Sequence, residues 1–177
     1  MPTAPSPLGP RQASWRTMRP DDLPAVVDIA AHAHPAYPEG EAVFTERLTL
    51  CPTGCLVLDG GSGPEGYVLS HPWCAAAPPA LDCALGALPA RPDCWYLHDI
   101  ALLPDARGRG APSAALAILA QRAGQAGLSR MALIATGSAR VYWLRAGFTP
   151  IDLPEAATIL ASYDPKAQLM IRAVHPA

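Results

Sequence analysis

The chain has 177 residues, half of them hydrophobic, which suffices for one folded domain with a buried core and excludes a disordered polypeptide. Its net charge is −2 and its isoelectric point about 6.2, which argues against the broad basic surface of a nucleic-acid-binding protein. No apolar run reaches the roughly 18 residues of a membrane span, so no membrane partner is expected.

The N-terminal segment predicts the limits of the folded domain, and the cysteines predict the cellular compartment of the protein. Residues 1–12 are rich in proline and lack the apolar stretch of a signal peptide, so we expect a flexible tail there and one domain over residues 13–177. An odd count of five cysteines without a secretory signal predicts free thiols and a cytoplasmic location. The spacing of Cys51 and Cys55 is marginal for a metal site and no second ligand pair stands out, so no metal is expected.

Apolar periodicity and turn residues divide the rest of the chain into strands and helices. The Arg-Pro-Asp-Asp run at residues 19–22 is predicted to open the first helix, with Asp21 or Asp22 as N-cap, and His34-Pro35 to end it. Further helices are predicted over residues 41–50, 113–123 and 139–146. Strands are predicted over residues 15–18, 55–58, 65–70, 95–103, 130–136, 148–153 and 166–174, the last two antiparallel to each other. Residues 71–94 show no period, and a connection of this length is often functional, here as a cover over a ligand cleft.

The segment from Leu97 to Gly110 carries the strongest functional signal. It reads Leu-His-Asp-Ile-Ala-Leu-Leu-Pro-Asp-Ala-Arg-Gly-Arg-Gly, an apolar strand followed by a basic glycine loop that runs into a helix. Glycines let the backbone approach a ligand, and a helix start offers unpaired N–H groups and a partial positive charge. Arg107 and Arg109 add donors suited to phosphate. The segment therefore predicts a site for a phosphorylated small molecule.

This loop and the order of the elements resemble the GNAT superfamily of acetyl-CoA-dependent N-acetyltransferases. The pyrophosphate loop of that family has the pattern Arg/Gln-x-x-Gly-x-Gly/Ala, and Arg107, Gly110 and Pro112 stand at its three defined positions. A second shared feature is a short helix that ends in Gly-Phe, here residues 139–146 followed by Gly147-Phe148. The resemblance covers about residues 14–174, and two motifs at matching spacing make it specific.

The resemblance implies a fold and a mode of cofactor binding. The fold would be a single mixed α/β (α+β) domain, with a central twisted sheet of six to seven strands, about four flanking helices, and a splay between the fourth and fifth strands. The pantetheine arm of acetyl-CoA would pair with the fourth strand like an added strand. The diphosphate would lie at the helix start, and a backbone N–H near Leu102 would polarise the thioester carbonyl. The residues implied for the cofactor are Ile100, Ala101, Leu102, Leu103, Arg107, Gly108, Arg109, Gly110, Ala111 and Trp143.

Two positions depart from the family pattern. Pro112 stands where glycine or alanine is expected, and proline suits the first turn of a helix but has no N–H to offer a phosphate. Trp143 stands where many members of the family have a tyrosine that protonates the departing thiolate, and an indole cannot do so. The neighbouring Tyr142 is the candidate acid, with a core aromatic as the alternative role and water as the alternative proton source.

The candidate base and acceptor residues follow the same reasoning. His98 and Asp99 lie on the fourth strand beside the expected thioester. His98 has the better intrinsic pKa for a base, and Asp99 could orient it or hold the substrate ammonium. Since successive strand residues face opposite sides, only one of the two is expected to point into the acceptor cleft. Tyr37 and Glu39, in the connection where the family often walls its acceptor site, and His71, expected in the loop after the third strand, are candidates for substrate binding. His32 and His34 are expected to be helix-end residues.

The sequence thus predicts an enzyme that transfers an acetyl group from acetyl-CoA to a primary amine, with coenzyme A as product and no metal. The acceptor could be a small molecule or a peptide, and a homodimer is possible. The rival hypothesis, motivated by Pro112 and Trp143, is a non-catalytic acyl-CoA-binding sensor or interaction module. A covalent route through Cys94, four residues before His98, is a further alternative that the resemblance disfavours.

Overall fold

One seven-stranded sheet, in the order β1-β2-β3-β4-β5-β7-β6, organises the chain in a computed structural model that describes residues 13–174. Neighbouring strands are antiparallel except β4 and β5, which are parallel. The strands are β1 Ser14–Thr17, β2 Leu56–Asp59, β3 Pro64–Trp73, β4 Cys94–Leu102, β5 Arg130–Ala135, β6 Thr149–Pro150 and β7 Gln168–Ala173. The α-helices are α1 Leu23–Ala33, α2 Glu41–Leu50, α3 Ala111–Gln125, α4 Arg140–Arg145 and α5 Ala157–Tyr163. This is the mixed α/β fold that the resemblance implied.

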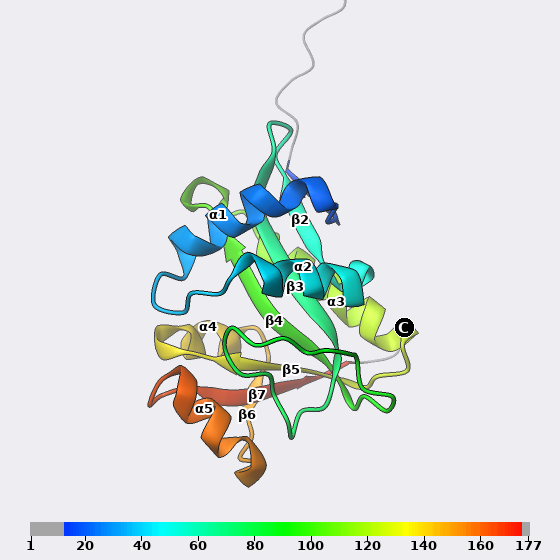
Figure 1. Cartoon of the computed structure of the whole chain (residues 1–177), viewed down its shortest axis with the longest axis vertical. Coiled ribbons are helices and arrows are strands. Elements are labelled where there is room, and N and C mark those ends of the chain that lie inside the picture. The colour runs from blue at the N-terminus through cyan, green and yellow to red at the C-terminus, as the bar shows by residue number, and fades with distance from the viewer. Residues whose placement is uncertain (1–12, 175–177) are drawn as a thin grey trace, which may run out of the picture.

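Helices cover both faces of the sheet, with α1 and α2 on one face and α3 on the other (Figure 1). The alternation of side chains along β3 explains the two layers, because Tyr67 and Leu69 pack beneath α1 and α2 while Val68 packs beneath α3. All three side chains are fully buried, and burial of one such residue is worth about 1.5–3 kcal/mol. The sheet is therefore held in place from both sides.

The parallel strands β4 and β5 pair over a short stretch and then diverge. Only Trp95 and Tyr96 of β4 pair with β5, opposite Met131 and Ala132. Beyond that point β5 pairs on its other side with β7, while the second half of β4 pairs on one side only, with β3. The predicted splay between the fourth and fifth strands is therefore present, and it leaves one edge of β4 open from Leu97 onward.

A bulge in β4 changes which way its side chains face. Leu69 of β3 lies opposite Asp99 whereas the next residue, Ser70, lies opposite Leu97, so His98 is the extra residue in β4. Trp95 and Leu97 before the bulge pack on the α3 face. After the bulge the alternation is shifted by one residue, so that Asp99 faces the same side as His98. The expectation that only one of these two residues faces the acceptor cleft is wrong for this reason.

Several predicted boundaries also change. Strand β3 runs to Trp73, so His71 lies inside a strand and not in the loop after it. The predicted strand over residues 148–153 is reduced to β6, which ends at Pro150 and is followed by Pro154, and it is antiparallel to β7 as expected. Helix α5 was not predicted; it has only seven residues, and none of them is fully buried.

The first helix has Asp22 at its N-cap position, one of the two residues predicted there. A 3₁₀ turn, η1 (Pro20–Asp22), precedes α1, and the side chain of Asp22 makes no capping hydrogen bond to the helix. The carboxylate of Asp22 accepts hydrogen bonds from the backbone N–H of Arg19 at 2.7 Å and from the guanidinium of Arg16 at 2.7 and 2.8 Å. Asp22 thus ties the turn back to β1. The predicted tail over residues 1–12 lies outside the described residues. Within residues 13–174 no helix combines the length and the apolar character needed to cross a bilayer.

Candidate active site

The open edge of β4 forms one wall of a groove of about 370 Å³, which we call the β4 groove. The groove is lined by Ala33, His34, Ile100, Ala101, Leu102, Arg107, Gly108, Pro112, Ala139, Tyr142 and Trp143. On its floor the carbonyl of Ile100 accepts from Nε2 of His34 at 3.3 Å, and the carbonyl of Leu102 accepts from Nε of Arg107 at 3.3 Å. Because the N–H and C=O of one strand residue point to the same side, the N–H groups of both residues also lie on the open edge.

Two of the four predicted cofactor-pairing residues on this strand do not offer backbone groups to the groove. Ala101 lies between Ile100 and Leu102 and turns its N–H and C=O toward β3. The N–H of Leu103 donates to the carbonyl of Glu65 at 2.8 Å, and its carbonyl accepts from the N–H of Ala106 at 3.0 Å. Both backbone groups of Leu103 are thus used within the fold. The open edge offers backbone groups as far as Leu102.

The basic glycine loop has the conformation that its glycines permit. Gly108 and Gly110 have φ angles of 75° and 74°, in the left-handed region that strongly favours glycine, and Gly110 leads directly into α3. The loop points its two arginines to different sides. Arg107 lines the β4 groove, whereas Arg109, with Gly110 and Ala111, lines a separate hollow. Pro112 is the second residue of α3, where the missing N–H breaks no bond within the helix.

Helix α4 supplies two aromatic side chains to the β4 groove. Tyr142 is exposed and Trp143 is buried, and their rings meet edge to face with centroids 4.9 Å apart. Trp143 also packs edge to face on Phe148 at 5.4 Å, so the Gly-Phe turn supports this wall of the groove. Partial burial raises the pKa of Tyr142, which keeps its phenol protonated and able to donate.

A second, smaller cavity of about 80 Å³ adjoins the groove, and we call it the acceptor cavity. It is lined by His34, Tyr37, Glu39, Leu81, Tyr96, His98, Asp99, Ile134, Thr136 and Tyr163. Four predicted site residues, Tyr37, Glu39, His98 and Asp99, therefore come together here. A shallow hollow shares Ala139 with the groove and Tyr37 with the cavity, and His34 lines all three spaces.

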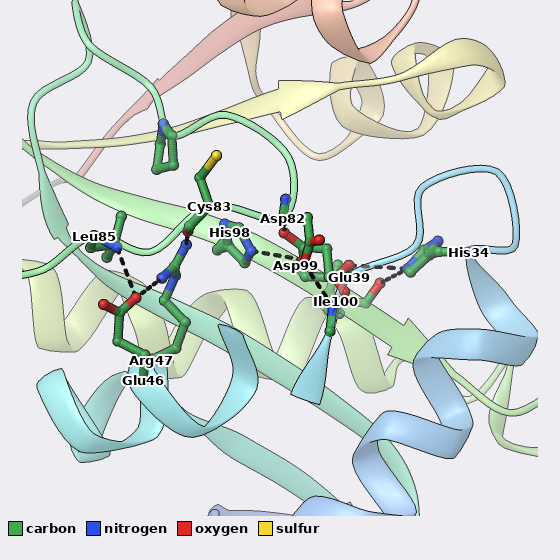
Figure 2. Close-up of polar contacts among 12 residues, drawn as sticks. His34, Glu39, Glu46, Arg47, Asp82, Cys83, Leu85, His98, Asp99 and Ile100 are labelled. Atoms are coloured by element: carbon green, nitrogen blue, oxygen red, sulfur yellow. Dashed lines mark hydrogen bonds and ion pairs between the residues drawn. The ribbon is translucent and has the colours of Figure 1, made fainter. Parts of the chain in front are cut away.

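His34 and Asp99 form a pair at the junction of the groove and the cavity (Figure 2). Nε2 of His34 lies 3.0 Å from Oδ1 of Asp99, and the other carboxylate oxygen accepts a short hydrogen bond from the phenol of Tyr67. The hydrogen bond to Asp99 raises the pKa of His34, which makes it a stronger base. Burial works to raise the pKa of Asp99, but the bonds from His34 and Tyr67 hold it below its usual range. The imidazole therefore has an ionised carboxylate behind it.

His98 is paired with Glu39 and not with Asp99. Its Nε2 lies 3.0 Å from Oε2 of Glu39, and the two side chains are only 3% and 7% exposed. The other ring nitrogen, Nδ1, is buried and has no hydrogen-bond partner among residues 13–174. The predicted partnership in which Asp99 orients His98 is thus replaced by two separate pairs, His34 with Asp99 and His98 with Glu39.

The long connection over residues 74–93, which we call the strap, crosses the sheet face beside α2 and closes the acceptor cavity with Leu81 (Figure 1). Polar bonds fix it to the segment before α2 and to α2 itself (Figure 2). Asp82 donates its N–H to Glu39 at 3.0 Å and accepts from the N–H of Gly40 at 2.7 Å. The carboxylate of Glu46 accepts from the backbone N–H of Leu85 at 2.8 Å. The strap is therefore an anchored wall, which agrees with the cover that its length suggested.

Two further residues singled out from the sequence lie away from the cavity lining. His71 is fully buried in β3 with its Nδ1 3.1 Å from the carbonyl of Pro72, and burial lowers its pKa to about 3. Its ring centroid is 6.3 Å from that of His98. Cys94 is buried as well, its thiol donates to the carbonyl of Trp73, and burial raises its pKa far above the usual range. A protonated, enclosed thiol is a poor nucleophile, which argues against the covalent route.

His34 is the site residue that sequence reasoning missed. It follows the last residue of α1, and a histidine at the end of a helix carries no functional signal of its own. Its partner Asp99 lies on another element, and only the fold brings the two together. Because His34 and Asp99 are far apart in the sequence, no local motif could have indicated this pair. Among the described residues, no group of three or more histidines, cysteines or carboxylates has the arrangement of a metal site.

Comparison with known proteins places this geometry in a family. Residues 24–148 match the model of the Acetyltransferase (GNAT) family, while no curated protein sequence matches the chain. The fold is similar to that of the GphF GNAT-like decarboxylase solved with isobutyryl-CoA, at 19% identity, a TM-score of 0.73, and coverage of 92% of this chain and 100% of that one. The loading GNATL domain of CurA from Lyngbya majuscula superposes with a TM-score of 0.75 at 10% identity, covering 93% and 98%.

A third similar structure is the ribosomal-protein-S18-alanine N-acetyltransferase of Escherichia coli. It is 19% identical, has a TM-score of 0.65, and the match covers 94% of this chain and 96% of that one. At such identities the three structures support the fold alone. The family model spans more than half of the chain, including the open strand, the glycine loop and the Gly-Phe turn. The chain therefore belongs to the GNAT family of acetyltransferases.

Proposed function

We propose that the protein transfers an acetyl group from acetyl-CoA to a primary amine by direct attack. The observation that carries this proposal is the junction at His34. There a groove with an open strand edge and a glycine loop meets a cavity lined by carboxylates and imidazoles. The groove offers what an acyl-CoA needs, and the cavity offers what an amine needs. The base lies where the two reactants would meet.

Acetyl-CoA would occupy the β4 groove. Its pantetheine amides would pair with the open edge of β4 at Ile100 and Leu102, replacing the side-chain donors that their carbonyls now accept. The diphosphate would lie against the start of α3, where N–H groups and the guanidinium of Arg107 are available. Pro112 removes one of these N–H groups, so we expect the remaining donors and Arg107 to carry more of the binding.

The chemistry follows from the side chains at the junction. His34, with Asp99 behind it, would take a proton from the ammonium of the acceptor, and the neutral amine would attack the thioester carbonyl. A backbone N–H on the edge near Leu102 would stabilise the oxyanion. As the C–S bond breaks, the thiolate of coenzyme A takes a proton from the phenol of Tyr142 or from water. The products are an amide and coenzyme A.

In this proposal the general base is His34, and not His98 as the sequence had suggested. His98 lines only the acceptor cavity, whereas His34 lines both the cavity and the groove and so lies closer to the reacting centre. We therefore assign His98 and Glu39 to acceptor binding, together with Tyr37. His71, enclosed behind His98, would support that side chain by packing.

Two other functions remain as outcomes of the test. The likeness to the GphF decarboxylase raises the possibility of acyl-CoA decarboxylation, but the lining of the acceptor cavity holds the carboxylates of Glu39 and Asp99 and no lysine or arginine. Such a lining disfavours an acyl group that carries a free carboxylate. The second is a non-catalytic acyl-CoA-binding module, which Pro112 and Trp143 suggested from the sequence.

Release of free thiol from acetyl-CoA, measured across a panel of primary amines, tests the proposal. We expect amine-dependent release with the acetylated amine as coproduct. Arg107→Ala should lower kcat/KM by about tenfold or more, the effect of losing one charge-assisted hydrogen bond, while Arg91→Ala, an exposed arginine of the strap, should match the wild type. Binding of acetyl-CoA without turnover of any amine would favour the non-catalytic module. Loss of carbon dioxide from a carboxylated acyl-CoA would favour decarboxylation.

A further inference from the structure

We infer that the acceptor is a compact primary amine whose far end carries a cationic hydrogen-bond donor, such as a short linear diamine. This inference rests on the proposed function, since it names the substrate class of the same site. Three properties of the acceptor cavity support it: its size, its charge, and a buried nitrogen that lacks a donor.

The size of the cavity limits what can pass His34. Its volume is about 80 Å³, whereas pockets for drug-sized ligands have about 300–1,000 Å³. The wall formed by Leu81 is fixed, because Glu46 holds the strap through Leu85, and Asp82 is bonded to both Glu39 and Gly40. Tyr163 of α5, which also lines the cavity, donates to the carbonyl of Pro79 at 2.9 Å. The far end of the acceptor must therefore be a short chain.

The charge of the lining selects the sign of that far end. Two carboxylates, Glu39 and Asp99, line the cavity, and neither lysine nor arginine is among the ten described residues that form its walls. The lining therefore offers no strong partner to a carboxylate such as that of a free amino acid. A cation in the same place would gain from Glu39, whose side chain is 7% exposed and therefore weakly screened.

The hydrogen bonding of His98 selects the chemistry of the far end. In the tautomer that carries its proton on Nε2, His98 donates to Glu39 and presents the lone pair of Nδ1. This nitrogen is buried and unpartnered among the described residues, in a side chain that is 3% exposed and lines the cavity. A buried acceptor without a partner is destabilising, and an N–H of the ligand would satisfy it. A distal ammonium supplies both the donor and the charge.

Each of the two histidines then contacts a different amine of the substrate. His34 lies at the junction with the β4 groove and serves the amine that reacts, whereas His98 lines only the cavity and serves the amine that does not react. Asp99 belongs to the first pair and Glu39 to the second. A diamine places one nitrogen at each pair.

Three amines of equal chain length test the inference, because they differ only in the distal group: diaminobutane, butylamine and aminobutanoate. We expect kcat/KM for diaminobutane to exceed that for butylamine by about tenfold to a hundredfold, the equivalent of one hydrogen bond to a charged group. Aminobutanoate should be the poorest substrate. His98→Phe should reduce the ratio of diaminobutane to butylamine toward one, whereas His32→Phe, an exposed residue of α1, should leave the ratio as it is.

A calorimetric titration of the three amines into the protein loaded with coenzyme A keeps this test separate from the proposed function. If no amine is acetylated but diaminobutane still binds more tightly than the other two, acetyl transfer is refuted and the ligand class stands. If thiol is released equally with all three amines, or fastest with aminobutanoate, transfer stands and the diamine inference is overturned. If neither turnover nor binding distinguishes the three amines, both fail.

Discussion

At the scale of single residues, the function of this chain depends on which imidazole faces which carboxylate. His98 and Asp99 are neighbours in sequence, yet each is paired with a residue from outside the strand, Glu39 and His34 respectively. The bulge at His98 makes this possible by turning both side chains to the same face of the sheet. The result is an imidazole with a raised pKa at the junction and a second imidazole whose Nδ1 has no hydrogen-bond partner among the described residues.

Replacing His34 tests the base directly. His34→Asn should lower kcat by about a hundredfold to ten-thousandfold, the usual contribution of a general base. His32→Asn is the matched control, because His32 is an exposed histidine of the same helix that contacts only the carbonyl of Asp28 among the described residues. Steady-state kinetics with the preferred amine gives both values. A His34→Asn enzyme with wild-type kcat would remove His34 from the mechanism.

The pH profile adds a second test at this scale. Since the bond to Asp99 raises the pKa of His34, kcat/KM should rise with pH through a midpoint above the ordinary histidine value of 6.5. Asp99→Asn removes the carboxylate, so the midpoint should move to lower pH while the plateau falls, because a less basic imidazole is a weaker catalyst. A midpoint that does not move in this variant would mean that another group controls the profile.

At the scale of elements, the sequence predicted the loops and helix ends that local residue types mark, but it did not predict the register between strands. The basic loop, the start of α3 and the Gly-Phe turn could be predicted because glycine, arginine and the apolar run mark them within a few residues. The positive φ angles of Gly108 and Gly110 agree with that reading. The bulge in β4 has no local sequence mark, because it is defined by pairing with β3, and the pairing of Asp99 with His34 was therefore not among the roles expected for Asp99.

The ion pairs at the start of the chain give a prediction for stability. Hydrogen bonds from Arg16 lower the pKa of Asp22 from its ordinary value of 3.8, and the Asp22 side chain is only 9% exposed. A lowered pKa means that the contribution is present above this ordinary value and is lost as the pH falls through the folded-state value. Asp22→Asn should therefore reduce the free energy of unfolding by about 1–3 kcal/mol near neutral pH.

Urea unfolding at about pH 7 and about pH 3 measures that difference. The difference in the free energy of unfolding between wild type and Asp22→Asn should become smaller at the lower pH, since protonation then removes the charge from the wild type as well. Asp28→Asn, a change at an exposed position of α1, should have the same free energy of unfolding as the wild type at either pH. A difference that stays constant between the two pH values would mean that packing, and not charge, accounts for the effect.

At the scale of the whole molecule, the site exists only where distant segments meet. The acceptor cavity takes its walls from the segment before α2, the strap, β4, β5 and α5. Element order and length predicted the sheet and the covering role of residues 71–94, and the family resemblance implied the splay. The sequence did not predict that Tyr163 lines the cavity, because the short helix α5 was not recognised. Long-range pairing, more than any motif, thus determines the acceptor site.

The central claim is that the β4 groove binds acetyl-CoA, and thermal unfolding with and without this ligand tests it most directly. At about 100 times its Kd the ligand should add roughly 2.7 kcal/mol, a rise in Tm of about 5–11 °C for a domain of this size. The rise should exceed that with ADP or AMP. It should shrink in Arg107→Ala more than in Arg109→Ala, because only Arg107 lines the groove. An unchanged Tm at millimolar acetyl-CoA, or an equal rise with AMP, would contradict the account.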